Sequence, residues 1–460
     1  MDRRLFLKKT AGFTGMVLSG LAFNPAKTYS RPTNLRITDI RGCTIASQYD
    51  FPIIKIYTNQ DVYGLGEVRD AGDVWQALIL KPWLVGKDPL EIEEILRSIK
   101  HFGGHGRTGG GYSAIDMALM DIAGKVLGVP AYRLLGPRMR RKIPIYADTY
   151  GDIDLEKVRK YIKRRLGKVF KHFKIDLRPW YLKPVEGAQS GGYPTEKGLA
   201  VWGEYVQAVR DIIGYDVVLG ADHFGNLNVE WAIKLGEFMA QPQYKLAYLE
   251  DLIGFRSRNA VNLMKQITAG SPTPTQGYED IFAFEGFRPF IDAGALDIIH
   301  PDMATSGGLI ETKKIADYAY MFGIPTMIHQ AGGPVGAIAA VHCAAAMQDF
   351  ISIENHCLDI PWWDDLVTGI DKPLIQDGSY TVPEKPGLGI EMNDEECKKY
   401  LREEQYVNKT GYFEPTPEFD EPMSWQEAQE KGIISRRAGW RGPWIHLDEE
   451  GNLVNRADGR

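Results

Sequence analysis

The chain has 460 residues, which is more than one ordinary domain, and its 44% hydrophobic and 25% charged residues are normal for a globular protein. The formal net charge is −6 and the sequence contains no stripe of basic residues, which argues against nucleic acid as a partner. The four cysteines do not have the spacing of a metal site; they are Cys43, Cys343, Cys357 and Cys397.

The first 30 residues resemble a twin-arginine export signal. Residues 2–8 read DRRLFLK, and a weakly apolar stretch with three glycines follows over residues 11–23. This stretch is too short and too rich in glycine for a stable membrane span, and no other segment of the sequence is long and apolar enough for one. We therefore expect an exported, periplasmic protein without stable membrane insertion, in which pairing of the cysteines stays open. The alternative is a disordered basic N-terminus on a cytoplasmic protein.

Residues 31–145 predict a small α+β unit. Two runs that read as antiparallel strands, LRITDIRGCTIAS and PIIKIYTNQDVYGLGE, include a polar turn at Asn59–Asp61. Two or three helices follow, and the clearest one is expected to begin at Ser113, a good N-cap, and to end at Gly128 and Pro130.

A G-x-G-x-x-G pattern in this unit does not predict a dinucleotide site. Its glycines are Gly104, Gly106 and Gly109, but a charged, helix-like run precedes them and Val129 stands where the acidic residue would be needed. We expect instead a flexible loop that closes over the mouth of the barrel predicted for the second half of the chain. From this loop, His105 and Arg107 could contact a bound substrate.

From residue 146 to residue 385, polar residues recur at the ends of apolar runs. Asp222, Glu250 and Glu279 are 28 and 29 residues apart, the length of one strand, one helix and two loops in a repeating βα fold. The period extends upstream to Lys174 and downstream through Asp302, His329 and Glu354, with further gaps of 23, 27 and 25 residues. This spacing predicts a (β/α) barrel of the TIM type, in which such residues line the mouth. Three carboxylates converging there predict a magnesium site.

Two segments interrupt or follow this period. Residues 178–192 contain two prolines and three glycines and predict a long loop after the strand that carries Lys174, where such loops usually serve substrate binding. Residues 386–460 are rich in charged and aromatic residues, and the part beyond about Lys409 has no interpretation from the sequence.

The ordered motifs of the chain resemble the enolase superfamily, in its mandelate racemase-like subgroup. The resemblance covers about residues 35–400 and rests on GLGE (Gly64–Glu67), the run from Gly109 to Gly136, FKID, GAD, YLED, GYED, HPDMATSGGL, GIPTMIH and KPGLGIE. It implies that the α+β unit caps the barrel and that the segment around KPGLGIE returns to this cap.

The resemblance also implies a chemistry. Sites of this superfamily pair a lysine or histidine base with one or two Mg²⁺ ions that stabilise an enediolate. Here Mg²⁺ would be held by Asp222, Glu250 and Glu279, and Asp251 would lie one layer behind them. His329 is expected to be the base, because histidine titrates near neutral pH. Asp302 would fix its tautomer, while Lys174 and Glu354 would hold the substrate carboxylate or the enediolate.

One departure from the family bears on the reaction. Many relatives have Lys-x-Lys where this chain has Lys174-Ile175-Asp176, and aspartate is a weaker base for the opposite face of the substrate. Racemisation needs two bases, whereas loss of water needs one base and one acid, which a single histidine can supply in turn. His223, directly after Asp222, could be another acid. Together with WWDDLVTG (Trp362–Gly369), which resembles sugar-acid dehydratases, this favours an aldonate or aldarate dehydratase, a hydro-lyase that forms a 2-keto-3-deoxy acid.

Two other functions stay open at this stage. An epimerase or cycloisomerase, that is, an isomerase, could act on a related carboxylate with Asp176 or His223 as the second group. A periplasmic sugar-acid binding protein could keep the pocket without turnover. In each case we expect a small sugar acid as the ligand, no nucleic acid, and a homo-oligomer.

Overall fold

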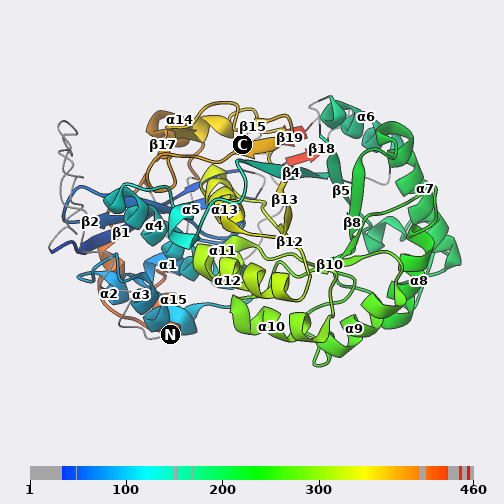
Figure 1. Cartoon of the computed structure of the whole chain (residues 1–460), viewed down its shortest axis with the longest axis horizontal. Coiled ribbons are helices and arrows are strands. Elements are labelled where there is room, and N and C mark those ends of the chain that lie inside the picture. The colour runs from blue at the N-terminus through cyan, green and yellow to red at the C-terminus, as the bar shows by residue number, and fades with distance from the viewer. Residues whose placement is uncertain are drawn as a thin grey trace, which may run out of the picture. The chain divides into compact units, whose positions relative to one another are not determined.

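Eight parallel strands form a closed barrel (Figure 1). The computed structural model describes residues 34–47, 49–149, 151, 154–167, 170–402, 411–433, 445–447 and 453–455. The last barrel strand pairs with the first, Glu354 opposite Tyr146, which closes the sheet. The strands are β4 (Lys142–Thr149), β5 (His172–Asp176), β8 (Val218–Asp222), β9 (Leu249–Glu250), β10 (Thr275–Gly277), β11 (Ile298–Ile299), β12 (Thr326–Ile328) and β13 (Phe350–Asn355). The (β/α) barrel expected from the spacing is therefore confirmed.

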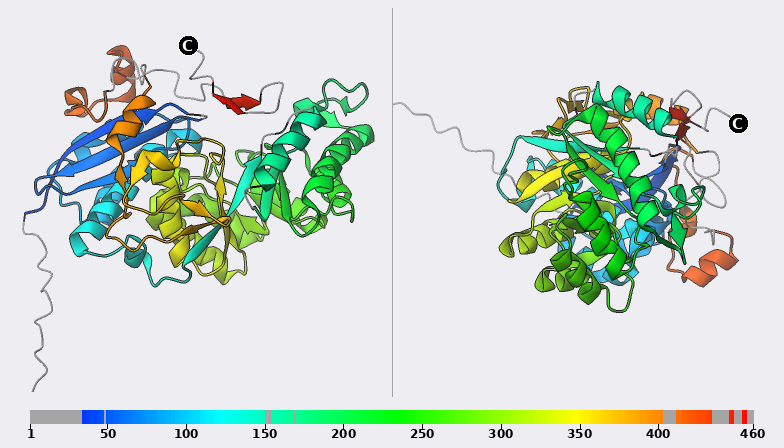
Figure 2. Two further views of the ribbon diagram at one scale, coloured as in Figure 1. Left: turned by 90° about the horizontal axis from the view of Figure 1, so that it is seen from above. Right: turned by 90° about the vertical axis from the view of Figure 1, so that its right-hand side faces the viewer.

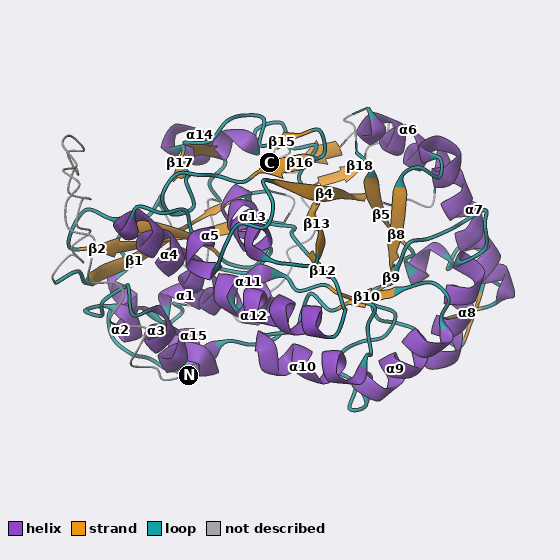
Figure 3. Ribbon diagram, in the orientation of Figure 1, coloured by secondary structure: helices purple, strands orange, loops and turns teal. Residues whose placement is uncertain are grey.

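A helix follows each barrel strand except the last, and these helices surround the strands (Figure 3). Three of them begin at a polar residue whose side chain accepts a backbone hydrogen bond, namely Asp154, Thr195 and Asn228, as helix N-termini require. Apolar residues at helical spacing face the strands, as Val158 and Ile162 do in the first helix. The helices are α6 (Leu155–Leu166), α7 (Glu196–Ile213), α8 (Val229–Met239), α9 (Ala260–Gly270), α10 (Ala283–Ala293), α12 (Gly308–Met321) and α13 (Pro334–Ala346).

The α+β cap is built on an antiparallel sheet of three strands, β1 (Ile37–Ile45), β2 (Phe51–Thr58) and β3 (Tyr63–Glu67). Figure 2 shows this sheet beside the yellow-green half of the barrel, at the end away from α7 and α8. Glycines let helix and sheet approach closely, because a Cβ at Gly66 would lie 2.0 Å from the Ala114 carbonyl oxygen. The cap helices are α1 (Trp75–Leu78), α2 (Lys81–Leu84), α3 (Ile92–Ile99) and α4 (Gly110–Leu127).

The start of α4 differs from the expected one. The helix begins at Gly110, and Ser113 lies inside its first turns rather than at its N-cap. The Ser113 hydroxyl oxygen instead accepts a hydrogen bond of 3.2 Å from the Gly307 amide, which belongs to the barrel. The residue that looked like a local cap is therefore a tertiary contact, whereas the expected C-terminus at Gly128, in the left-handed region, is confirmed.

The cap is attached to the barrel by buried carboxylates. Glu67, at the end of β3, accepts hydrogen bonds from the amides of Gly333 and Gly336 at the N-terminus of α13. Asp121 of α4 accepts a 2.7 Å bond from the Leu388 amide, within the KPGLGIE segment. Glu67 thus attaches the cap to the N-terminus of a barrel helix, and Asp121 attaches it to the segment that follows the barrel.

The polypeptide after the barrel contacts both the barrel and the cap. Strand β16 (Ser379–Thr381) pairs with barrel strand β4 and forms a hairpin with β15 (Ile375–Gln376), and β14 (Val367–Thr368) pairs with β17 (Glu391–Met392). In the extension beyond Lys409, Phe419 and Ala428 are buried in the core of the cap, and Trp425 packs edge-on against Trp75. The remaining helices there are α14 (Asp394–Lys399) and α15 (Trp425–Glu430).

The export signal predicted for residues 1–30 lies outside the described residues. In the part of the chain that the structure covers, no helix combines the length and the apolar character needed to cross a bilayer. All four cysteines are buried and free.

Candidate active site and metal centre

The barrel strands bring the expected lysine into the centre of the site. Lys174 alternates with Phe173 and Ile175 along β5, so its side chain points into the barrel while theirs face the helices. Its Nζ lies 3.0 Å from Glu250 Oε1 and 2.6 Å from Glu354 Oε1. Burial lowers the pKa of Lys174, but these two carboxylates outweigh it and raise the pKa well above its ordinary value. Lys174 is therefore a fixed cation between two acids.

Two of the three predicted metal ligands converge with a histidine. The ligand atoms of Glu250, Glu279 and His300 all lie within 4.8 Å of one another, and His300 Nδ1 is 3.3 Å from Glu250 Oε1. Asp222 pairs with Glu250 in the strand register, but one of its carboxylate oxygens accepts a hydrogen bond from the Phe224 amide, and it does not belong to this close group. The structure thus shows an acidic and histidine-containing candidate metal site at the mouth.

The electrostatics of these carboxylates suit a bound dication. Burial, and then the neighbouring acids Glu250 and Asp251, raise the pKa of both Asp222 and Glu279 well above the ordinary value of a carboxyl. Asp251 is half-buried, and its desolvation followed by the charge of Glu250 raises its pKa in the same way. Carboxylates that repel one another inside a protein are stabilised when a hard cation binds between them.

His329 and Asp302 form the expected pair. His329 Nδ1 lies 2.6 Å from Asp302 Oδ2, and Arg69 from the cap holds the same oxygen at 2.5 Å. Asp302 is also the N-cap of the short helix α11 (Met303–Ser306), where it accepts from the Thr305 amide. Burial, and then the charge of Arg69, lower the pKa of His329 well below its ordinary value. The ring therefore favours the neutral form, and its Nε2 faces Glu279 and Glu354 at 3.6 Å each.

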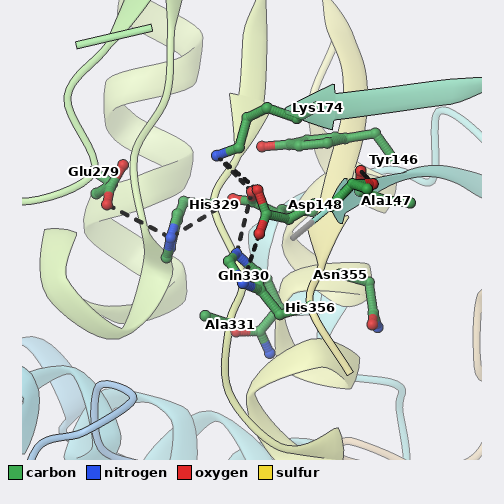
Figure 4. A network of polar contacts seen from close by, with 12 residues as sticks. Tyr146, Ala147, Asp148, Lys174, Glu279, His329, Gln330, Ala331, Asn355 and His356 are labelled. Atoms are coloured by element: carbon green, nitrogen blue, oxygen red, sulfur yellow. Dashed lines mark hydrogen bonds and ion pairs between the residues drawn. The ribbon is translucent and has the colours of Figure 1, made fainter. Parts of the chain in front are cut away.

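Glu354 has a second histidine beside it. His356 Nε2 lies 3.2 Å from Glu354 Oε1, and His356 Nδ1 lies 3.1 Å from Asp148 Oδ2 on β4 (Figure 4). Burial raises the pKa of Glu354, but Lys174, His329 and His356 outweigh it and lower the pKa well below its ordinary value. Glu354 is therefore an ionised acceptor on which three basic side chains meet.

Asp176 and His223 are held by partners outside this cluster. The Asp176 carboxylate is ion-paired with Arg178, whose Nε donates to it at 2.6 Å. The His223 ring is fully buried and packs edge-on against Trp202 of α7, and burial lowers the pKa of His223 to about 3. Side chains of neighbouring strand residues point to opposite faces, which turns His223 away from the barrel interior when Asp222 faces it.

The glycine-containing loop of the cap does reach the barrel mouth. His105 Nδ1 accepts a 3.0 Å hydrogen bond from the Phe282 amide, and the amide of Gly106 donates to the Asp280 carbonyl at 2.8 Å. Arg107 instead binds Asp70 of the cap through two hydrogen bonds of 2.9 and 3.0 Å. The loop is thus attached beside Glu279, while its arginine is held by a cap carboxylate.

Several residues of the cluster were not identified from the sequence. His300 and His356 each stand two residues from a predicted site residue, Asp302 and Glu354, so alternation along a strand end could have indicated them. The Tyr146 hydroxyl is 2.6 Å from His300 Nε2, and Asp148 stands two residues further along β4. The sequence analysis assigns no site residue to the first barrel strand, although Asp148 precedes Lys174 by 26 residues, a gap like those between the other site residues.

Comparison with known proteins agrees with this geometry. The family model described as enolase C-terminal domain-like matches residues 155–396, and the mandelate racemase / muconate lactonizing enzyme N-terminal domain matches residues 26–136. A D-xylonate dehydratase of Haloferax volcanii is 30% identical over 380 residues, covering 80% of this chain and 89% of that protein. A D-galactonate dehydratase family member of Salmonella virchow is 29% identical, covering 80% and 94%.

Solved structures give the same result. A mandelate racemase/muconate lactonizing enzyme-like protein from Rubrobacter xylanophilus superimposes with a TM-score of 0.74 at 27% identity, covering 83% of this chain and all of that one. The 3,6-anhydro-D-galactonate cycloisomerase from Zobellia galactanivorans gives 0.68 at 25% identity, covering 80% and 99%. Matched over both its cap and its barrel, the chain belongs to the enolase superfamily, in the mandelate racemase and muconate lactonizing enzyme group.

Proposed function

We propose that this protein is a Mg²⁺-dependent sugar-acid dehydratase, a hydro-lyase that converts an aldonate or aldarate to its 2-keto-3-deoxy acid. The observation that carries the proposal is the His329–Asp302 pair, in which Nε2 of the histidine faces a group of carboxylates beside Lys174. The dehydratases among the curated relatives support water loss from a sugar acid as the reaction.

The residues present fit a magnesium ion. Glu250 and Glu279 would hold it with oxygen atoms, Asp222 would complete the set after a rotation away from the Phe224 amide, and His300 lies beside them. When bound, the ion neutralises the substrate carboxylate and the negative charge that develops on it as the α-proton leaves.

The chain's own residues carry out the proton transfer. His329 Nε2 takes the proton from the α-carbon, and Asp302 behind Nδ1 stabilises the imidazolium that forms. Lys174, held as a cation by Glu250 and Glu354, offers N–H donors to the substrate carboxylate. The buried position of all these groups strengthens each charge interaction relative to water.

Dehydration is favoured over racemisation because the residue in the position of the second base, on the opposite face of the substrate, is engaged in an ion pair. Asp176 stands where many relatives carry that base, and its carboxylate is bound by Arg178. A cycloisomerase remains the second candidate, since one matched structure carries that activity in its name. A binding protein without turnover is not supported, because the curated relatives named above are enzymes.

Proton NMR in D₂O tests the proposal. The protein with Mg²⁺ is incubated with a panel of aldonic, aldaric and uronic acids. We expect loss of the α-proton signal together with a new CH₂ or CHD signal at the neighbouring carbon. Exchange of the α-proton without elimination, for every acid that reacts, would instead favour the isomerase.

We also propose that the protein is exported to the periplasm in the folded state, because residues 2–8 carry the twin-arginine pattern. Fractionation of cells that express the full chain tests this. Replacing Arg3 and Arg4 by lysine is expected to leave the protein in the cytoplasm, and unchanged export of that variant would contradict the proposal.

A further inference from the structure

Loss of water requires a proton for the departing hydroxyl as well as a base for the α-carbon. We propose that His356 is the acid that donates this proton to the β-hydroxyl, and that Asp148 positions it. This inference rests on the dehydratase function proposed above and assigns a second, separate residue to its second proton transfer.

The geometry of His356 repeats that of the base. In both cases a carboxylate lies behind Nδ1, Asp302 at 2.6 Å from His329 and Asp148 at 3.1 Å from His356. A carboxylate in that position keeps the proton on Nδ1 and presents Nε2 to the site. Asp148 comes from β4 and His356 follows β13, the two strands whose pairing closes the barrel.

The two histidines converge on one place. His329 Nε2 lies 3.6 Å from one oxygen of Glu354, and His356 Nε2 lies 3.2 Å from the other. Their ring centroids are 5.7 Å apart (Figure 4). The α-hydrogen and the β-hydroxyl of a sugar acid are carried by neighbouring carbon atoms, so an acid and a base for elimination must be close to each other in this way.

The surroundings of His356 favour a proton on the ring. Burial lowers the pKa of His356, but Asp148 and Glu354 outweigh it and raise the pKa above its ordinary value. Lys174 opposes them through its charge, Asp70 of the cap interacts with the ring at longer range, and Tyr49 covers the ring edge-on at 5.6 Å. The site thus places His356 as a proton donor next to His329 as a base. Such acid and base pairs arise where different surroundings move the pKa values of two groups apart.

Asp176 and His223, the other two residues expected to take part in proton transfer, have other partners. Asp176 is ion-paired with Arg178, and the His223 ring packs against Trp202. Among the described residues of the cluster, His356 is therefore the side chain with both a partner behind it and a nitrogen directed at the Glu354 carboxylate.

The proton balance of the elimination closes with these two residues. His329 takes the α-proton, and the electron pair of that C–H bond forms the enediolate. The enediolate expels the β-oxygen, the C–O bond breaks with its electrons on oxygen, and the proton from His356 completes a water molecule. The enol that remains takes the proton of His329 at the β-carbon and returns its hydroxyl proton to His356 through solvent, which gives the 2-keto-3-deoxy acid and restores both histidines.

His356→Gln tests the assignment with two substrates. One is the sugar acid that the wild type dehydrates, and the other is its 3-deoxy-3-fluoro analogue, whose fluoride leaves without a strong acid. We expect kcat for water loss to fall about 100-fold or more, whereas fluoride release falls by less than about tenfold. In D₂O the variant should also exchange the α-proton of the ordinary substrate, since His329 is intact. Asp148→Asn should lower water loss in the same pattern and by less, and the exposed His101→Gln should change neither reaction.

The outcomes separate the two proposals. Equal losses of water release, fluoride release and α-proton exchange in His356→Gln would overturn the acid role and leave the dehydratase in place. So would unchanged water release. No dehydration by the wild type of any acid in the panel would overturn the proposed function, and the role of His356 with it.

Discussion

His329 and Asp302 are joined by a contact of 2.6 Å between Nδ1 and Oδ2, although 27 residues separate them in the chain. Parallel pairing at the ends of β11 and β12 produces it, because Asp302 and His329 form a bridge in adjacent strands. Arg69 of the cap binds the same carboxylate, so the orientation of the base depends on cap and barrel together.

Asp302→Asn is expected to lower kcat about 100-fold or more at neutral pH while the protein remains folded. An amide oxygen can still accept from Nδ1, but it does not stabilise the imidazolium that forms when His329 takes the proton. Steady-state kinetics and α-proton exchange in D₂O check this, with Asp292→Asn on the surface of α10 as the control. Full exchange activity in Asp302→Asn would show that His329 works without its partner.

Removal of magnesium with EDTA is expected to abolish activity, and added Mg²⁺ to restore it. Asp222→Asn should lower the affinity for Mg²⁺ about 100-fold or more, because a carboxylate ligand is lost. Titration calorimetry with Mg²⁺ measures this without substrate. Asp216→Asn, an exposed acid just before the same strand, is the matched control. Wild-type Mg²⁺ affinity and activity in Asp222→Asn would contradict its assignment as a ligand.

Lys174→Met should destabilise the protein even without substrate. The change removes the buried cation between Glu250 and Glu354 and leaves both carboxylates facing each other, which typically costs about 3–5 kcal/mol. We expect the variant to melt at a lower temperature than the wild type in metal-free buffer. With Mg²⁺ this difference in melting temperature should be smaller, because the ion supplies positive charge beside Glu250. Lys234→Met, on the exposed face of α8, controls for loss of a surface lysine. An unchanged melting temperature would argue against a fixed cation at this place.

The sequence predicted the elements that repeat and missed what depends on side-chain direction. The spacing of polar residues after apolar runs identified the barrel and placed Lys174, His329 and Glu354, because strand ends follow one another at a regular distance in βα folds. It did not show that Asp222 turns toward the Phe224 amide or that His223 packs on Trp202. The first outcome depends on the conformation of the chain just after the strand, and the second on a helix that precedes the strand.

Residues on the first strand were missed for a related reason. Tyr146 and Asp148 join the site because their strand, β4, pairs with β13. That strand is about 200 residues away in the chain, and the two pair only because the barrel closes. The extension beyond Lys409 is a second example. Its Phe419 and Ala428 complete the core of a cap formed near the start of the chain. Local patterns contain no information about such closing contacts.

Acid is expected to destabilise the fold through His342 of α13, outside the active site. Its Nδ1 accepts from the Tyr132 amide and its Nε2 lies 3.0 Å from the Leu388 carbonyl oxygen, so it links α13 to the chain segments on either side. Burial lowers the pKa of His342 to about 4, whereas an unfolded histidine titrates near 6.5. The folded state therefore stays unprotonated while the unfolded state takes up a proton, and stability is lost as pH falls from about 6.5 toward 4.

This group alone should lower the free energy of unfolding by about 2 kcal/mol at pH 5 relative to pH 7, because each pH unit below 6.5 costs about 1.4 kcal/mol. Glutamine can accept and donate in the same two directions without titrating, so His342→Gln should reduce the difference in unfolding free energy between pH 7 and pH 5 by about that amount. Urea unfolding at both pH values measures it, with the exposed His101→Gln as the control. If His342→Gln keeps the full pH dependence of the wild type, the acid sensitivity arises elsewhere, and His172, whose pKa burial lowers to about 3, is the next histidine to replace.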